Sequence, residues 1–167
     1  MDDLVIRLIE VTQQEIFNFQ KLLGVLNLEQ QALMNQDIKA LKSTLKDQRT
    51  ISKVSVSLEK DRTEVINQLA IVLKEDRDGL TLKRLVERIT GPHKVQLEEI
   101  RSVLLELQIK IQKANRQNTL LINQSMKYVD KTIHILSGSS NSGGVYEQTG
   151  KIENILSPVS GIVDEVV

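Results

Sequence analysis

The sequence has no cysteine, and its 167 residues include only two prolines, eight glycines and four aromatic residues. Without cysteine, the chain has no disulfide, no thiolate zinc site and no cysteine nucleophile. Surfaces that bind single-stranded nucleic acid combine basic residues with stacking aromatic rings. Rings here come only from Phe17, Phe19, Tyr128 and Tyr146. The composition therefore argues against thiol chemistry and against a nucleic-acid partner.

Charge of one sign is also missing, because 22 Lys and Arg residues balance 22 Asp and Glu residues. No strong electrostatic field attracts the chain to nucleic acid or to anionic lipid. The first ten residues carry acids where a signal peptide would be basic. No stretch approaches the roughly 18 consecutive apolar residues of a membrane span. We therefore expect a cytoplasmic protein with no membrane insertion.

What the sequence does have is apolar residues that recur at alternating spacings of three and four, which is the period of one helical face. A first helix is predicted to begin at Asp2 or Asp3 and to end before Asn35 and Gln36, with Asp37 capping the next helix. Its apolar face is expected to comprise Val5, Ile9, Thr12, Ile16, Phe19, Leu23, Leu26, Gln30 and Leu33.

A second helix is predicted from Ile38 to about Leu73, with a change of phase in its apolar face between Leu45 and Ile51. The expected face consists of Ile38, Leu41, Leu45, Ile51, Val54, Leu58, Val65, Leu69 and Val72. A short helix is predicted from Thr81 to about Thr90, where Gly91 and Pro92 punctuate the chain.

The longest predicted helix lies between Pro92 and Ser137, where the sequence has no further glycine or proline. Its apolar face begins with Leu97, Ile100, Leu104, Leu107, Ile111 and Ala114. Uninterrupted, such a helix extends roughly 70 Å. A rod of this length has no second surface to close around a catalytic cleft.

The predicted fold class is all-α: an antiparallel, coiled-coil-like bundle of three long helices plus one short helix, with a flexible C-terminal tail. No window shows the sustained alternation of a strand. After Ser137 the sequence becomes rich in glycine and serine. We predict a helical bundle over residues 1–137 and a flexible linker with a partner-binding tail over residues 138–167.

Residues that support catalysis or metal binding are not found in a suitable pattern. His93 and His134 lie 41 positions apart in one predicted helix, so one metal ion cannot bind both in a single chain. Acidic residues such as Glu98 and Glu99 are adjacent, and adjacent helix positions point about 100° apart. We therefore predict no catalytic residues, no metal and no cofactor, and a protein that is not an enzyme.

A polar stretch interrupts the longest helix at residues 112–119, where Asn115 and Asn118 fall near the otherwise apolar face. One interpretation is a polar layer in the core that fixes the helix register, as single asparagines do in coiled coils. The other is a boundary between a structural half and a binding half of the helix. The sequence leaves both open.

The end of this helix carries eight apolar residues among the 16 positions from Leu121 to Leu136. They form two adjacent seams: the first seam is Ile122, Met126, Val129, Ile133 and Leu136, and the second seam is Leu121, Tyr128 and Ile135. Together they cover roughly half of the helix circumference, whereas a core-facing stripe is nearer 100° wide. Such a broad surface suits either packing against two neighbouring helices or a partner helix laid along it.

The order of the C-terminal elements resembles FlgN-type flagellar export chaperones. The resemblance rests on the long helices, on Asn118, Leu120 to Asn123 and Tyr128, and on the small-residue linker followed by Tyr146 and Gly150. In place of the usual aspartate or glycine after the tyrosine, this chain has Glu147.

The resemblance implies a cytoplasmic chaperone without enzymatic activity. Its partners would be the C-terminal helices of flagellar hook–filament junction proteins and components of the type III export apparatus. The chaperone would keep the junction proteins from assembling early and deliver them for export. The implied partner-binding residues are both seams together with Tyr146 and Gly150. The alternative hypothesis is a structural coiled-coil or adaptor protein that self-assembles through the same seams, whereas the chaperone hypothesis predicts a monomer or a weak homodimer.

Overall fold

The computed structural model describes residues 1–75 and 81–137, and every regular element within these ranges is a helix. The elements are α1 (Asp2–Met34), α2 (Ile38–Leu73), α3 (Leu82–Arg88) and α4 (Pro92–Leu136). Three long helices and one short helix confirm the predicted fold class. The chain divides into two compact units, residues 1–125 and 126–167, with the boundary inside α4.

Local sequence signals account for the helix ends. The Asp37 side chain caps α2 by accepting a hydrogen bond of 2.9 Å from the amide of Ala40. Gln36 and Lys74 both have φ of 55° and so adopt the left-handed conformation that terminates α1 and α2. At the start of α4, Gly91 has φ of 87° and Pro92 occupies the first helical position. These ends agree with the predicted boundaries to within one or two residues.

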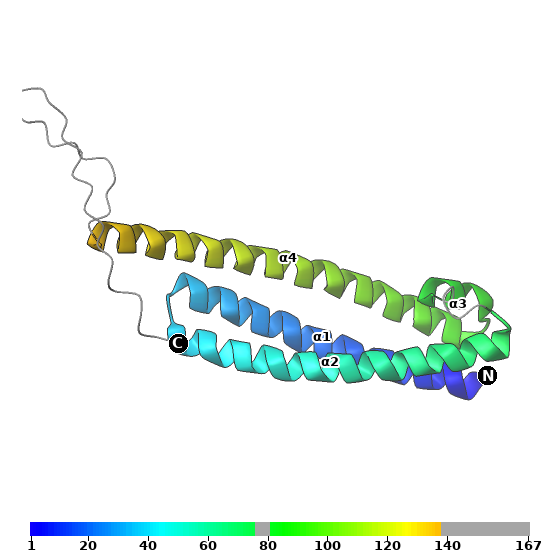
Figure 1. Ribbon diagram of the computed structural model, residues 1–167. Helices are drawn as coiled ribbons and strands as arrows, with labels where there is room; N and C mark the ends of the chain where they lie inside the picture. Colours follow the sequence, from blue (N-terminus) through cyan, green and yellow to red (C-terminus); the bar gives the residue numbers. More distant parts are fainter. Residues whose placement is uncertain (76–80, 138–167) are drawn as a thin grey trace, which may run out of the picture. The chain divides into compact units, whose positions relative to one another are not determined.

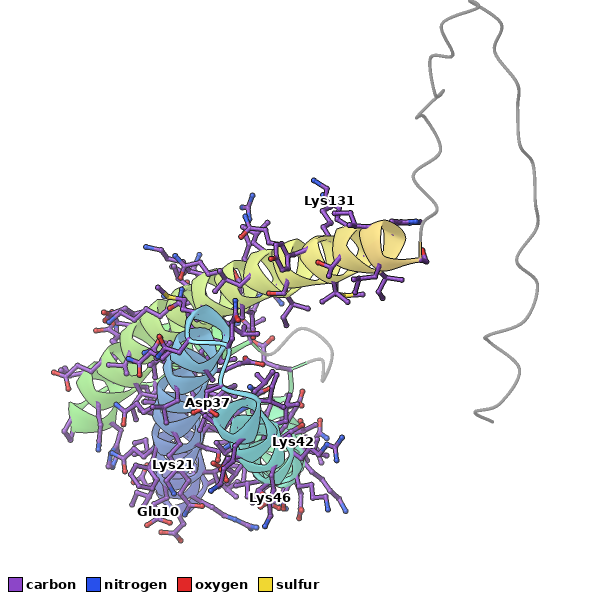
Figure 2. The ribbon with its side chains drawn as sticks, turned by 90° about the vertical axis from the view of Figure 1, so that its left-hand side faces the viewer. Glu10, Lys21, Asp37, Lys42, Lys46 and Lys131 are labelled. Carbon is purple, nitrogen blue, oxygen red and sulfur yellow. The ribbon has the colours of Figure 1, made fainter. Side chains whose placement is uncertain are left out.

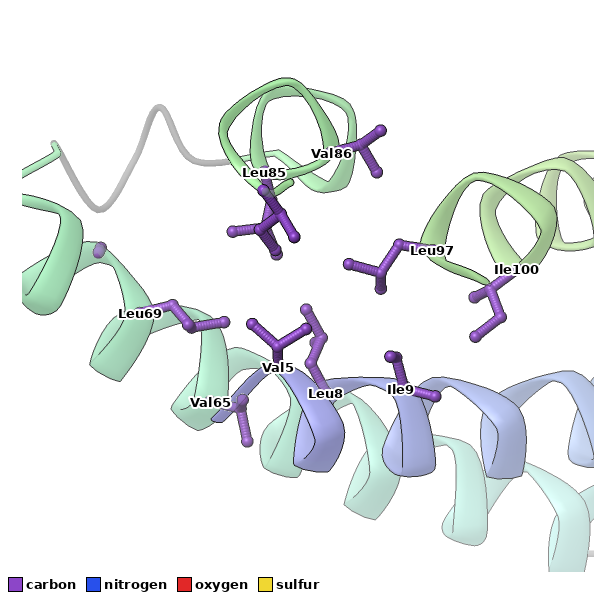
Figure 3. Close-up of a cluster of buried hydrophobic side chains, with 11 residues drawn as sticks. Val5, Leu8, Ile9, Val65, Leu69, Leu85, Val86, Leu97 and Ile100 are labelled. Carbon is purple, nitrogen blue, oxygen red and sulfur yellow. The ribbon is translucent and has the colours of Figure 1, made fainter. Parts of the chain in front are cut away.

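Within the first unit, α1 and α2 form an antiparallel hairpin, and α3 lies at the end of the hairpin that holds the N-terminus (Figure 1). All four helices contribute to one apolar cluster at that end. Leu85 and Val86 of α3 point towards α1 and the start of α4, where they meet residues such as Leu8 and Leu97 (Figure 3). The cluster consists of Val5, Leu8, Ile9, Val65, Leu69, Ala70, Leu85, Val86, Ile89, Leu97 and Ile100.

Most charged side chains lie on the outer faces of the helices. Glu10 and Lys21 on α1 and Lys42 and Lys46 on α2 are all exposed and point away from the packed faces (Figure 2). This segregation of apolar and charged residues is what an amphipathic helix bundle requires.

The predicted face of α1 is buried or half-buried throughout, but the helix buries a second face as well. That second face includes Leu8, Val11, Glu15, Asn18 and Glu29. This second face is covered because α1 packs against α2 on one side and against α4 on the other. The predicted face included only the residues needed to contact one neighbouring helix, so it was too narrow.

The predicted face of α2 needs a correction. Ile38, Leu45, Val54 and Val72 are exposed, and no change of phase occurs. The covered face instead continues at strict three- and four-residue spacing and includes polar residues, as follows: Leu41, Thr44, Gln48, Ile51, Ser55, Leu58, Arg62, Val65 and Leu69. The apparent discontinuity arose because only apolar residues were counted.

Candidate partner-binding surface

The C-terminal part of α4 presents the apolar residues that the sequence singled out. Helix α4 continues without a break to Leu136, as the absence of glycine and proline predicted. Every residue from 122 to 137 is exposed. Met126, Tyr128 and Val129 have 59%, 72% and 53% of their surface accessible. This is a large amount of apolar surface for a stretch of about four helical turns.

Both seams lie along one continuous helix, so their residues are brought together as predicted. The first seam is exposed along its whole length, from 38% at Ile122 to 81% at Leu136. In the second seam, Tyr128 and Ile135 are exposed but Leu121 is half-buried. Leu121 is the last α4 residue with reduced exposure, so it belongs partly to the packed face.

Hydroxyl groups on this part of α4 bond back to the helix. Ser125 donates a hydrogen bond of 2.9 Å to the carbonyl of Leu121, and Thr132 donates one of 2.9 Å to the carbonyl of Tyr128. Because these donors are satisfied within the helix, an apolar partner can approach without leaving them unpaired.

Tyr146 and Gly150, the two remaining predicted site residues, lie outside the described residues. The same holds for the whole predicted tail, residues 138–167. The division into a bundle and a partner-binding tail therefore stays a prediction.

A polar contact marks the point on α4 where burial ends. The Asn118 amide nitrogen donates hydrogen bonds to the carbonyl of Leu26 at 2.9 Å and to Oε2 of Glu29 at 2.7 Å. Asn118 is 3% exposed, while Asn115 is exposed. The contact ties α4 to α1 at one register, which supports the polar-layer interpretation for Asn118 alone.

A second polar contact lies between α1 and α2; it is part-buried and was not predicted from the sequence. The Glu15 carboxylate accepts a hydrogen bond of 2.9 Å from Nε of Arg62. Burial raises the pKa of Glu15, and the neighbouring Arg62 only partly opposes that rise. One signal was available: Glu15 continues the three- and four-residue spacing of Leu8 and Thr12.

The described residues offer little for catalysis or metal binding. Within residues 1–75 and 81–137, no group of three or more His, Asp or Glu side chains is placed to hold a metal ion. Glu98 and Glu99 are exposed, and Glu75 forms an ion pair of 2.6 Å with Arg88. In the described part of the chain, no helix combines the length and the apolar character of a membrane span. What the described residues do present is the exposed apolar surface at the end of α4, and a surface of this kind is typical of proteins that bind other proteins.

Comparison with known proteins identifies which class of binding protein this is. The family model described as "FlgN protein" matches residues 1–154. The chain therefore belongs to the FlgN family, a family of flagellar export chaperones rather than of enzymes. No curated protein and no solved structure matches the chain. Membership of this family implies that the chain binds flagellar export substrates.

Proposed function

We propose that this chaperone binds the C-terminal helical segment of flagellar hook–filament junction proteins along the two seams of α4. By covering that segment in the cytoplasm, it prevents premature assembly and delivers the client to the type III export apparatus. The observation that carries the proposal is the exposure of the apolar residues between Ile122 and Leu136.

Simple energetics support this assignment. Each large apolar side chain gains about 1.5–3 kcal/mol when it is fully removed from water, so even partial burial of several seam residues provides a substantial driving force. An amphipathic client helix laid along α4 would bury its own apolar face in return. Because the chaperone binds only the unassembled client, mass action shifts the client away from polymerisation.

We further propose a role for the C-terminal tail in client binding. Residues 138–167, with Tyr146 and Gly150, fold over the bound client helix. Ordering a flexible segment costs conformational entropy, so it keeps the affinity moderate. Moderate affinity allows the client to be released at the export apparatus.

The test is a charge substitution within the first seam. The double variant Val129→Asp with Ile133→Asp is titrated with a peptide from the C-terminal helix of a junction protein, and binding is measured by calorimetry and by the gain of helical circular dichroism. We expect binding to be abolished, because two charges would have to be buried without partners.

A matched control changes the same helix by the same net charge. Lys127→Glu also lowers the charge by two units, but Lys127 has no seam residue three or four positions away and so lies on the other side of α4. This control should bind the peptide like the wild type. Equal binding by all three proteins, each with an unchanged thermal unfolding profile, would contradict the proposal.

The exposed seams equally suit the alternative function, a structural protein that self-assembles through them. Light scattering over a wide range of protein concentration separates the two. A tight dimer or tetramer that Val129→Asp with Ile133→Asp converts to a monomer favours self-assembly. A wild-type monomer or weak dimer that binds the peptide favours the chaperone.

A further inference from the structure

A groove with a volume of about 650 Å³ lies in the first unit, among α1, α4 and the start of α3. We refer to it as the α1–α4 groove. Its volume is within the range typical of ligand sites. Every residue that lines it lies between positions 15 and 112, so it is separate from both seams. The lining residues are Glu15, Phe19, Leu22, Arg62, Thr81, Leu82, Lys83, Arg101, Leu104, Leu105, Gln108, Ile111 and Gln112.

The walls of this groove are apolar and only partly covered. Phe19 and Leu22 on α1 and Leu104 and Ile111 on α4 are half-buried, and Leu105 is 44% exposed. The α4 wall extends from Arg101 to Gln112, which is about 16 Å at the usual helical rise. This length matches two to three turns of a second helix.

The groove persists because α4 is held at both ends of it. On one side, Leu97 and Ile100 are anchored in the apolar cluster with Val5, Leu8 and Ile9. On the other side, Asn118 is hydrogen-bonded to α1. Between these anchors the side chains of α1 and α4 leave space, and packing of the bundle itself does not fill it.

The groove lining carries more positive than negative charge. Arg62 is paired with Glu15, the single acidic residue of the lining. Lys83 and Arg101 add two further positive charges near the end where α3 begins. An apolar surface with an excess of positive charge at one end is complementary to an amphipathic segment that carries carboxylates.

We propose that the α1–α4 groove is a second docking site, which binds a short amphipathic helix of a partner protein. Two or three turns of that helix place apolar side chains against Phe19, Leu22 and Leu105. Acidic side chains of the partner face Lys83 and Arg101. The site goes beyond the client-binding function proposed above and gives the chaperone a means of holding a second protein while its seams are occupied.

The experiment uses the absence of tryptophan from the chain. Gln108 is exposed on the groove edge, so Gln108→Trp introduces a single fluorescent reporter there. The probe is a synthetic 14-residue helical peptide with leucine at positions 1, 4, 5, 8, 11 and 12, three glutamates beside the leucines, and glutamine elsewhere. Its matched partner has lysine in place of the three glutamates. We expect the acidic peptide to shift the tryptophan emission and to bind about tenfold more tightly than the basic one.

Variants in the reporter background locate the site. Leu105→Asp should weaken binding of the acidic peptide about tenfold or more, whereas Val103→Asp, on the opposite side of α4, should not. Lys83→Glu with Arg101→Glu should abolish the preference for the acidic peptide. Val129→Asp with Ile133→Asp should leave the emission change intact, which separates this site from the client site.

Three results would overturn the proposal: equal affinity for the two peptides, binding that Leu105→Asp does not affect, or an emission change that is lost in the seam variant. An emission shift that depends on protein concentration without any peptide would mean that a second copy of the chain occupies the groove, which also overturns it. Circular dichroism of each variant verifies that the bundle remains folded.

Discussion

The contact between Asn118 and Glu29 provides a quantitative test of how α4 is held to α1. Both side chains are buried, at 3% and 6% exposure, and one amide nitrogen serves the Glu29 carboxylate and the Leu26 carbonyl. Asn118→Leu leaves the buried carboxylate without this donor. A hydrogen bond to a charged group contributes about 1.5–3 kcal/mol and a neutral one about 1 kcal/mol.

An opposing term reduces the expected loss. Oδ1 of Asn118 is buried and has no hydrogen-bond partner, so replacing the side chain removes an unsatisfied acceptor that costs about 1–3 kcal/mol. We therefore expect Asn118→Leu to lower the free energy of unfolding by about 2 kcal/mol. Glu29→Leu should lower it by a similar or smaller amount, because the Asn118 amide keeps its bond to Leu26.

The double variant distinguishes this explanation from simple loss of packing. When both partners become apolar, no buried polar group is stranded, and the free energy of unfolding should return to near the wild-type value. The coupling energy of the double-mutant cycle is then about 2–4 kcal/mol, the sum of the two single-variant losses. Urea unfolding followed by circular dichroism measures all four proteins. Asn115→Leu, an exposed position on the same helix, is the control and should change stability by less than about 0.5 kcal/mol.

Additive losses in the two single variants would refute this reasoning, because they would show that Asn118 and Glu29 do not stabilise the fold through each other. A second readout concerns specificity. A buried polar pair fixes one helix register, so the stable double variant should show broadened amide resonances in NMR spectra, whereas the wild type gives one set of sharp resonances.

Four further predictions concern the pH dependence of stability and the ends of α2. Since burial raises the pKa of Glu15, the stability of the wild type relative to Glu15→Gln should be greatest below about pH 4 and should fall as pH rises through that pKa, as urea titrations at several pH values would show. Glu106→Gln should give the opposite slope, because Lys110 lowers the pKa of Glu106 and its contribution is lost as pH falls. Asp37→Ala removes the cap of α2 and should cost about 1 kcal/mol in thermal unfolding, while Asp37→Ser should retain most of the stability. Lys74→Gly relieves a left-handed residue at the end of α2 and should raise the free energy of unfolding by about 1 kcal/mol; a decrease would contradict the assigned backbone conformation.

The helices and their ends were predictable because their signals are local. Asp37, Gly91 and Pro92 act through their own backbone neighbours. The α4 face from Leu97 to Ala114 is a repeat of apolar residues that needs no knowledge of the partner helix. The exposure of most of both seams also agrees with a face that is wider than one neighbour requires.

The buried polar residues were not predictable, because each depends on a partner distant in sequence. Asn18 donates hydrogen bonds of 3.2 and 2.7 Å to the carbonyl of Ile51 and the hydroxyl of Ser55. Only this pairing makes Ser55 part of the covered face of α2. A count of apolar residues omits such positions and instead assigns Val54 to the core, where the structure leaves it exposed. The α1–α4 groove was missed for the same reason, since it depends on the spacing between two helices.

The loss of burial beyond Leu121 has a consequence for how α4 moves. The eleven residues from Met126 to Leu136 are helical but none is buried, and an isolated helix shorter than about 12–15 residues is marginal in water. These residues are helical because they extend the packed turns that precede them. The unfavourable first step of helix formation, nucleation, takes place in those packed turns. Amide protons of this segment should exchange with deuterated solvent far faster than those near Leu107, although both belong to one unbroken helix. The segment from Met126 to Leu136 should therefore unfold locally more easily than the packed part of α4, although no glycine or proline separates the two parts of the helix.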